Sequence, residues 1–153
     1  MIVFLDFDGV THPTPCQVDA LFAQLPLIEA VLREFETPRI VISSSWRVVH
    51  PLGVLREFFS PDLAARVIGV TPVMEAERVD QGWLPGPAQR FERQWECETW
   101  MHRNRPQGAS WLALDDWPYG FEPKCPHLLL TNPESGFAPD DAPRLRALLE
   151  ERL

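Results

Sequence analysis

The chain has 153 residues, of which 45% are hydrophobic and 24% are charged. This length favours a single domain over residues 1–153, and the composition is that of a globular protein, which excludes global disorder. The net charge of −8 disfavours extended binding along a nucleic-acid backbone. A small phosphorylated substrate, a nucleic-acid end and a divalent cation all stay compatible with that charge.

No apolar run approaches the roughly 20 residues that a membrane-spanning helix needs. The N-terminal residues MIVFLDFDGV carry no basic stretch, so we expect no signal peptide, no membrane association and a cytoplasmic protein. The cysteines Cys16, Cys97 and Cys125 are widely spaced. We interpret them as reduced thiols rather than as a disulfide framework or a zinc site.

Short apolar runs alternate with helical patterns along the chain. The apolar runs predict strands at residues 2–7, 39–43, 66–70, 111–114 and 127–130. Apolar residues at helical spacing predict helices at residues 27–35, 52–59 and 88–103, and a terminal helix that begins at Pro143. Residues 71–87 have no period and are interpreted as a loop or small excursion. The alternation predicts an α/β, three-layer Rossmann-like domain with a mostly parallel five-stranded sheet.

Polar residues gather at the ends of three predicted strands. Asp6 and Asp8 end the first, a serine run that begins at Ser43 ends the second, and Asp115-Asp116 end the fourth. In an open parallel sheet the carboxyl ends of the strands meet at one edge, where ligands bind. Because side chains alternate along a strand, Asp6 and Asp8 lie on the same side of it. We therefore expect these polar groups to share one crevice.

Four carboxylates in one crevice repel each other unless a cation neutralises them. Mg²⁺ with oxygen ligands is the usual solution beside a phosphate, so the pattern indicates phosphoryl chemistry. One aspartate can attack phosphorus and form an aspartyl-phosphate, and a second can protonate the leaving oxygen and later activate water. The serine hydroxyls and the backbone N–H groups beside them can bind the non-bridging oxygens.

The segments LDFDGV, VISSSW and LALDD resemble motifs I, II and IV of the haloacid-dehalogenase (HAD) superfamily, in the right order. A closer resemblance is to the small HAD domain of bacterial "Swiss Army Knife" RNA-repair proteins. It is carried by LDFDGV, VISSSWR, IGVTP, RxxE before a Trp, LDDW and TNPxxG, which together span residues 2–137. The resemblance implies a HAD-like fold and a Mg²⁺-dependent phosphatase.

The resemblance also implies roles for individual residues. Asp6 is expected to be the nucleophile and a Mg²⁺ ligand, and Asp8 the general acid/base, with its backbone carbonyl on the metal. Ser43 is expected to bind the substrate phosphate, with Ser44 as the alternative. The metal site is completed by Asp115, assisted directly or through water by Asp116.

Motif III, which normally supplies a lysine, departs from the family pattern. The only lysine, Lys124, comes after motif IV and is out of order. Arg93 fits the family's spacing best and Arg90 second, although either could be a solvated helix residue. Arg47, which follows the serines, could hold a substrate phosphate through two parallel hydrogen bonds or could form a salt bridge within the protein.

The short distance from Asp8 to Ser43 leaves no room for a large cap domain, so we expect an essentially capless, open site. An open site favours a macromolecular end over a buried metabolite, and the RNA-repair resemblance points to nucleic-acid ends and to a ligase or kinase partner. Trp46 and Trp117 could stack a base beside the phosphate or could pack within the protein. The alternative function is a non-catalytic HAD-fold module that binds phosphate or protein, but the retention of Asp6 and Asp8 favours catalysis.

Overall fold

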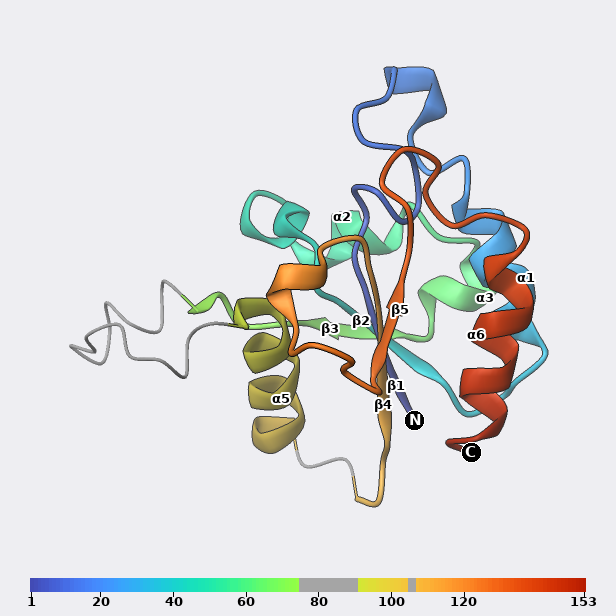
Figure 1. Ribbon diagram of the computed structural model, residues 1–153. Helices are drawn as coiled ribbons and strands as arrows, with labels where there is room; N and C mark the ends of the chain where they lie inside the picture. Colours follow the sequence, from blue (N-terminus) through green and yellow to red (C-terminus); the bar gives the residue numbers. More distant parts are fainter. Residues whose placement is uncertain (75–90, 105–106) are drawn as a thin grey trace.

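The computed structural model describes residues 1–74, 91–104 and 107–153. Five parallel strands form one sheet in the order β3-β2-β1-β4-β5, with helices on both faces (Figure 1). This is the three-layer, Rossmann-like α/β architecture predicted from the sequence, and all of its strand pairs are parallel. The strands are β1 (Ile2–Leu5), β2 (Arg39–Ile42), β3 (Val67–Val70), β4 (Trp111–Asp115) and β5 (Leu128–Leu130).

The pairing of the central strand β1 with both neighbours sets the register of β2 and β4 relative to each other. Leu5 is in register with Ile42 of β2 and with Leu114 of β4. The ladder continues past the strand ends, where the Asp6 N–H donates to the Leu114 carbonyl at 3.1 Å and the Ser43 N–H donates to the Leu5 carbonyl at 3.0 Å. The residues that follow the three strands therefore lie side by side at one edge of the sheet, as expected for parallel pairing.

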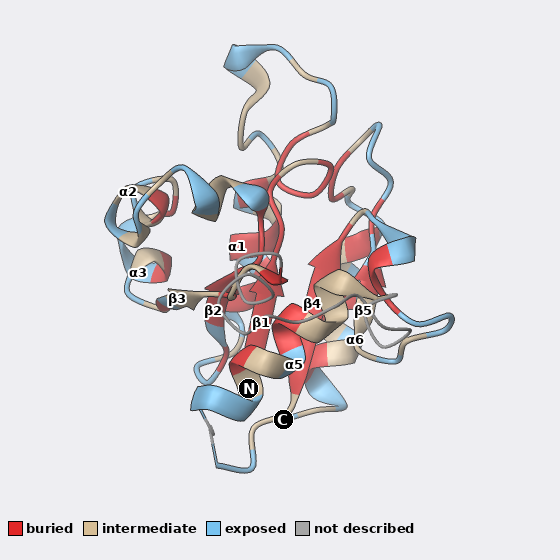
Figure 2. Cartoon of the chain, turned by 90° about the vertical axis from the view of Figure 1, so that its left-hand side faces the viewer, coloured by how far each residue is buried: buried red, intermediate tan, exposed pale blue. Residues whose placement is uncertain are grey.

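Alternation along the strands gives the sheet two apolar faces. On one face Val3 and Leu5 belong to the larger core, which includes residues of α1 (Leu25–Arg33), α3 (Pro61–Ala64) and α6 (Asp141–Glu150). On the other face Ile2 and Phe4 pack with Cys97 and Trp100 of α5 (Glu92–Asn104). Figure 2 shows the buried strands between helices whose outer surfaces are exposed. Burial on both faces explains why the strands read as continuous apolar runs.

The helices differ from the sequence prediction mainly at their ends. The helix predicted at 52–59 is shorter, because α2 (Leu52–Arg56) stops at Arg56 and α3 begins after it at Pro61, a favourable first helical position. Helix α6 begins two residues before Pro143, which its first turn accommodates. The first part of the helix predicted at 88–103 lies outside the described residues, as does most of the segment at 71–87.

No cap domain is inserted between β1 and β2. The chain there forms the short 3₁₀ helix η1 (Val18–Ala20) and then α1. The loop after β1 is held from the other end of the chain, since the Thr14 N–H donates to the Pro133 carbonyl at 2.8 Å and the Phe137 N–H donates to the Val10 carbonyl at 2.7 Å. The described part of the chain therefore leaves the carboxyl edge of the sheet without a separate covering domain at this position.

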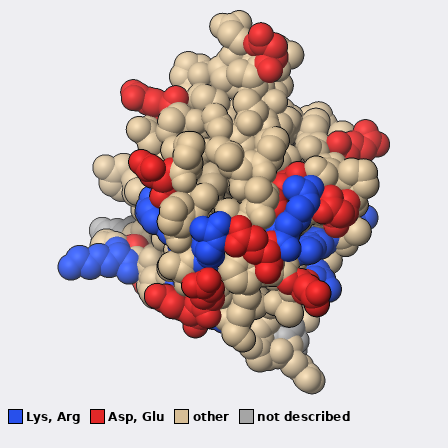
Figure 3. All heavy atoms as spheres, turned by 90° about the vertical axis from the view of Figure 1, so that its right-hand side faces the viewer, with Lys and Arg blue, Asp and Glu red and all other residues tan. Residues whose placement is uncertain are grey.

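The outer surface of α1 and α6 carries alternating charges rather than a basic field (Figure 3). Arg33 pairs with Asp62 at 2.7 Å, and Arg146 pairs with Glu34 at 2.6 Å. Exposed pairs of this kind contribute little to stability. Within the described residues, no helix has both the length and the apolar character needed to cross a membrane.

Candidate active site

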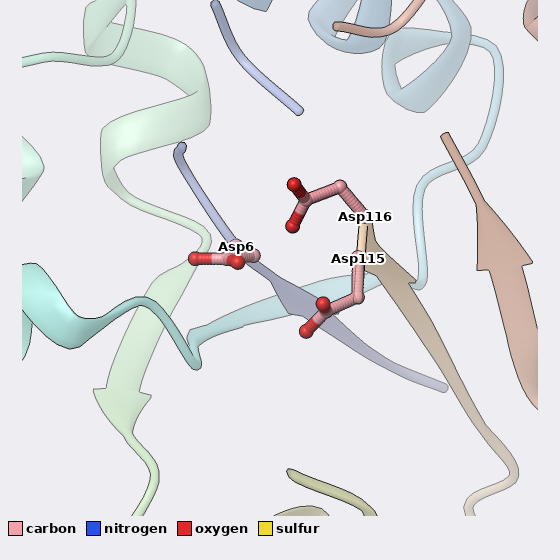
Figure 4. A group of neighbouring side chains, drawn as sticks. All are labelled: Asp6, Asp115 and Asp116. Atoms are coloured by element: carbon pink, nitrogen blue, oxygen red, sulfur yellow. The ribbon is translucent and has the colours of Figure 1, made fainter. Parts of the chain in front are cut away.

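Three carboxylates meet at the carboxyl edge of the sheet. Asp6 follows β1, Asp115 ends β4, and Asp116 comes directly after it (Figure 4). One oxygen from each lies within 4.8 Å of the others. Asp6 and Asp115 are buried and Asp116 is half-buried. The register of β1 with β4 thus brings together residues that are more than a hundred positions apart in the sequence.

Burial makes these charges costly. It raises the pKa of Asp6, although Arg93, the Phe7 N–H and the Ser44 hydroxyl offset part of the rise. Burial, and next the charge of Asp6, raise the pKa of Asp115 to about 8. Burial and Asp6 also raise the pKa of Asp116. The cluster is therefore short of positive charge.

The donor set of this cluster fits a divalent cation. The Oδ2 atom of Asp115 is fully buried and accepts no hydrogen bond from the described residues, although Nε of Arg93 lies 3.2 Å from it. Such an atom carries a desolvation cost that a ligand can remove. Three carboxylates within one ligand shell suit a hard cation such as Mg²⁺, which prefers oxygen. Asp6, Asp115 and Asp116 are the side chains that would hold it.

Arg93, on the first turn of α5, faces the same cluster. Its Nη2 lies 3.9 Å from Asp6 Oδ2, and its Nε lies 3.2 Å from Asp115 Oδ2. Although burial acts to lower the pKa of Arg93, the charges of Asp6, Asp115 and Glu96 raise it, so the guanidinium is firmly charged. Arg93 is thus a buried cation at the site rather than a solvated helix residue. Arg90, the second candidate for motif III, lies outside the described residues.

The guanidinium of Arg47 is engaged by groups of the protein itself. Its Nε and Nη groups donate to the carbonyls of Thr71, Pro72, Ser43 and Ser44. Its Nη2 also lies 2.7 Å from Glu96 Oε2. These contacts use all five N–H groups of a guanidinium. These contacts favour the alternative interpretation of Arg47, a salt bridge that ties the serine loop to the end of β3, over that of a phosphate ligand.

Glu96 links the two arginines. Its Oε2 contacts Arg47 and, at 3.2 Å, Nη1 of Arg93, while its Oε1 accepts the Met74 N–H at 3.1 Å. Arg93 Nη1 also donates to the Ser43 carbonyl. The buried Arg47–Glu96–Arg93 triad joins α5 to the ends of β2 and β3. The RxxE pattern of the sequence thus places Glu96 one helical turn after Arg93, where its carboxylate holds the guanidinium beside the aspartates.

Asp8 stands beside the carboxylate cluster with a different environment. Its side chain is 44% exposed. Its Oδ1 lies 2.9 Å from Nε2 of His12, and its Oδ2 accepts Nε1–H of Trp46 at 3.0 Å. The sequence reading gave His12 no role, because only the folded loop turns it back onto Asp8. Trp46 also packs edge-on against Phe7, so it is both a core residue and a hydrogen-bond donor.

The two serines differ in their partners. The Ser44 hydroxyl accepts the Trp46 N–H at 3.4 Å and hydrogen-bonds Asp6. The Ser43 hydroxyl is buried and has no hydrogen-bond partner among the described residues. The Ser43 hydroxyl is thus free to hydrogen-bond a ligand, whereas the Ser44 hydroxyl already has partners beside the carboxylate of Asp6.

Gly9 allows Asp116 to approach the loop after β1. Its φ is +71°, and a Cβ at this position would lie 2.2 Å from Asp116 Oδ2. The Thr131 hydroxyl donates to the Gly9 carbonyl at 2.8 Å and pins this turn to the end of β5. The glycine of the DxDG sequence is therefore required by both backbone conformation and space.

Trp117 forms a wall beside Arg93. Its N–H donates to Asp115 Oδ1 at 2.9 Å, and its ring lies close to Gly120. The ring is partly exposed and lines a cavity of about 180 Å³ together with Arg47, Arg93 and Glu96. This wall places an aromatic surface next to the charged groups without closing over them.

We predict that Asp115→Asn stabilises the protein in the absence of divalent cations. The unfolded carboxyl of Asp115 loses its proton near pH 4, whereas the folded one keeps it up to about pH 8, so Asp115 costs stability progressively as pH rises between these values. Removing the ionisable group should raise Tm by roughly 3–6 °C at pH 7.5, with the difference shrinking towards pH 4. Thermal unfolding in EDTA at several pH values measures this.

Millimolar Mg²⁺ should then raise the Tm of the wild type more than that of Asp115→Asn, because a cation stabilises only the state that binds it. The exposed Asp19→Asn serves as the matched control and should behave like wild type in both conditions. Equal Mg²⁺ stabilisation of wild type and Asp115→Asn would place the cation elsewhere.

We predict that Glu96→Gln costs about 3–5 kcal/mol of unfolding free energy, because it leaves two buried arginines short of a counter-charge. The control is Glu98→Gln on the same helix, where the glutamate is exposed and pairs with Gln94, and where a change of less than about 0.5 kcal/mol is expected. Urea unfolding of the two variants compares them. Similar small losses would show that the triad contributes little.

The comparisons with known proteins agree with this geometry. A family model described as "HAD domain in Swiss Army Knife RNA repair proteins" matches residues 2–142. Neither the curated proteins nor the solved structures gave a match. The match spans the three acidic residues, the serine loop, Arg93 and all five strands. The chain belongs to the family of HAD domains found in Swiss Army Knife RNA repair proteins.

Proposed function

We propose that this protein is a Mg²⁺-dependent phosphoric monoester hydrolase that works through an aspartyl-phosphate. The observation that carries the proposal is the position of Asp6, a buried carboxylate between Asp115 and Arg93 at the open edge of the sheet. A buried carboxylate beside a fixed cation is a typical nucleophile of this chemistry. Mg²⁺, when held by Asp6, Asp115, Asp116 and the Asp8 carbonyl, would offset negative charge on the transferring phosphoryl group.

In the first step an oxygen of Asp6 attacks phosphorus and the bond between phosphorus and the ester oxygen breaks. Protonated Asp8 gives its proton to that oxygen, which leaves as an alcohol. The product on the enzyme is an acyl phosphate on Asp6. Asp8 is suited to this role because its side chain, which is 44% exposed, is accessible to an incoming ester.

In the second step water attacks the phosphorus of the acyl phosphate. The carboxylate of Asp8 takes a proton from that water, and the bond between phosphorus and Asp6 breaks. Inorganic phosphate leaves, Asp6 returns to its ionised form and Asp8 is again protonated. The two steps sum to the hydrolysis of one phosphate ester by one water molecule.

Arg93 takes the place of the motif III lysine in this scheme. Its guanidinium lies between Asp6 and Asp115 and is held there by Glu96, so its charge is already in place before a phosphate enters. A preorganised cation of this kind lowers the repulsion between the incoming phosphate and Asp6. The Ser43 hydroxyl, with no partner of its own, supplies a donor for a non-bridging oxygen.

We propose a nucleic-acid end as the substrate, in the context of RNA repair. The family description supports this context, and the lack of an inserted domain between β1 and β2 leaves room for a large substrate. The net charge of −8 favours contacts limited to the terminal phosphate. We also propose that the protein is cytoplasmic. Its partner would be a ligase or kinase that acts on the same nucleic-acid end.

We predict that Asp6→Asn lowers the turnover of 4-nitrophenyl phosphate by on the order of 10³-fold or more, since an amide cannot act as the anionic nucleophile. A panel of 5′- and 3′-phosphorylated oligonucleotides, nucleotides and sugar phosphates, assayed by phosphate release with Mg²⁺ present, then identifies the substrate class. Asp19→Asn is the control. A wild-type protein that binds phosphate but hydrolyses nothing would favour the non-catalytic HAD-fold module.

We predict that Arg93→Ala lowers kcat by on the order of 10²-fold, as the loss of one preorganised donor does in other enzymes. Arg93→Lys should recover part of the loss, because lysine keeps the charge but not the planar geometry. Arg146→Ala, which removes only an exposed pair, should leave kcat unchanged. Damage from Arg90→Ala combined with a silent Arg93→Ala would move the motif III role to Arg90.

A further inference from the structure

His12 is a buried titratable side chain to which the mechanism above gives no role. Only 1% of its side chain is exposed, and it lies in the loop after β1, four residues beyond Asp8. The ring packs edge-on against Phe22 at a centroid distance of 5.2 Å and lies 6.0 Å from the Trp46 ring. The ring is thus enclosed by aromatic side chains, and its hydrogen-bond partners decide which way its two nitrogens face.

The hydrogen-bond partners of the His12 ring show which of its nitrogens carries the hydrogen. The backbone N–H of Phe22 donates to Nδ1 of His12 at 3.3 Å, so Nδ1 is an acceptor. In the neutral ring the hydrogen is then on Nε2, which lies 2.9 Å from Asp8 Oδ1. The Thr11 hydroxyl lies 3.1 Å from Nδ1 and donates its hydrogen to the Phe7 carbonyl at 3.0 Å, so the Phe22 N–H is the donor that assigns Nδ1. His12 therefore presents a fixed N–H to Asp8.

Asp8 thus receives one hydrogen bond on each oxygen. His12 donates to Oδ1, and Trp46 donates to Oδ2 at 3.0 Å. Each oxygen keeps a second lone pair on which a proton can sit, and the side chain as a whole is 44% exposed. The two hydrogen bonds hold the plane of the carboxyl group and so limit the directions in which its proton can leave.

We propose that His12 is a positioning residue that aims the proton of Asp8 at the leaving oxygen of the substrate. This inference rests on the proposed phosphatase function. The step itself is the proton transfer already described, in which the Asp8 O–H bond breaks and a bond from that hydrogen to the ester oxygen forms. His12 keeps its own hydrogen throughout and acts only through the orientation of Asp8.

The test compares two esters that differ in their need for a proton. 4-Nitrophenolate leaves without protonation far more readily than phenolate does, so kcat for phenyl phosphate depends more strongly on an aimed acid. His12→Phe keeps an aromatic ring but removes the donor. We expect it to lower kcat for phenyl phosphate at least about 10-fold more than kcat for 4-nitrophenyl phosphate, with little change in KM for either.

His12→Gln carries an N–H donor that can reach Asp8 and should fall between wild type and His12→Phe. The matched control is His50→Phe, since His50 also packs against the Trp46 ring, at a centroid distance of 5.6 Å. It should leave the ratio of the two kcat values unchanged. Equal losses for the two esters in His12→Phe would overturn the proposal and leave His12 a purely structural residue.

A measurement without turnover separates this inference from the proposed function. In ¹⁵N NMR spectra of the wild type, His12 should show a bare Nδ1 and a protonated Nε2, and Asp8→Asn should shift the Nε2 signal. A protonated Nδ1 with a bare Nε2 would overturn the positioning role. A wild-type protein that hydrolyses neither ester would refute the proposed function, and the positioning role of His12 with it. Equal losses of kcat for the two esters in His12→Phe would refute the role of His12 alone.

Discussion

The repulsion among Asp6, Asp115 and Asp116 is the constraint on which the site depends. Parallel pairing of β1 with β4 forces these carboxylates together at one edge, and burial removes the water that would screen them. Arg93 supplies one fixed positive charge, which is too little for three anions. The remaining excess of negative charge makes the cluster suited to a divalent cation. A negatively charged phosphoryl group would be tolerated there only with that cation bound.

The fixed charge itself depends on a second buried layer. Arg93 contacts Asp6 and Asp115 on one side, and Glu96 from the next turn of α5 contacts it on another. Arg47 balances Glu96 and carries the link to the carbonyls at the ends of β2 and β3. The position of the Arg93 guanidinium is thus set by the packing of three elements, which is a common way of achieving preorganisation.

Much of the site could be predicted from the sequence because strand ends are visible in it. The apolar runs that end in Asp6, Ser43 and Asp115 predicted both the sheet and the edge where the polar residues gather. For Arg93 the sequence also allowed a solvated position on the helix surface, and only the fold decided against it. The use of every N–H of Arg47 and the return of His12 onto Asp8 could not be predicted. Both depend on backbone carbonyls and loop turns that have no signature in side-chain pattern.

The pairing of β1 with β4 joins Ile2 to Trp111, so the two halves of the carboxylate cluster meet only after the chain has closed a loop of over a hundred residues. Contacts so distant in sequence form slowly and late. A folding intermediate that contains β1, β2 and β3 alone would carry Asp6 without Asp115 and could not assemble the cation site. Binding at the proposed cation site would therefore report the pairing of β1 with β4, and nascent chains that have not yet formed β4 would lack the proposed activity towards phosphate esters.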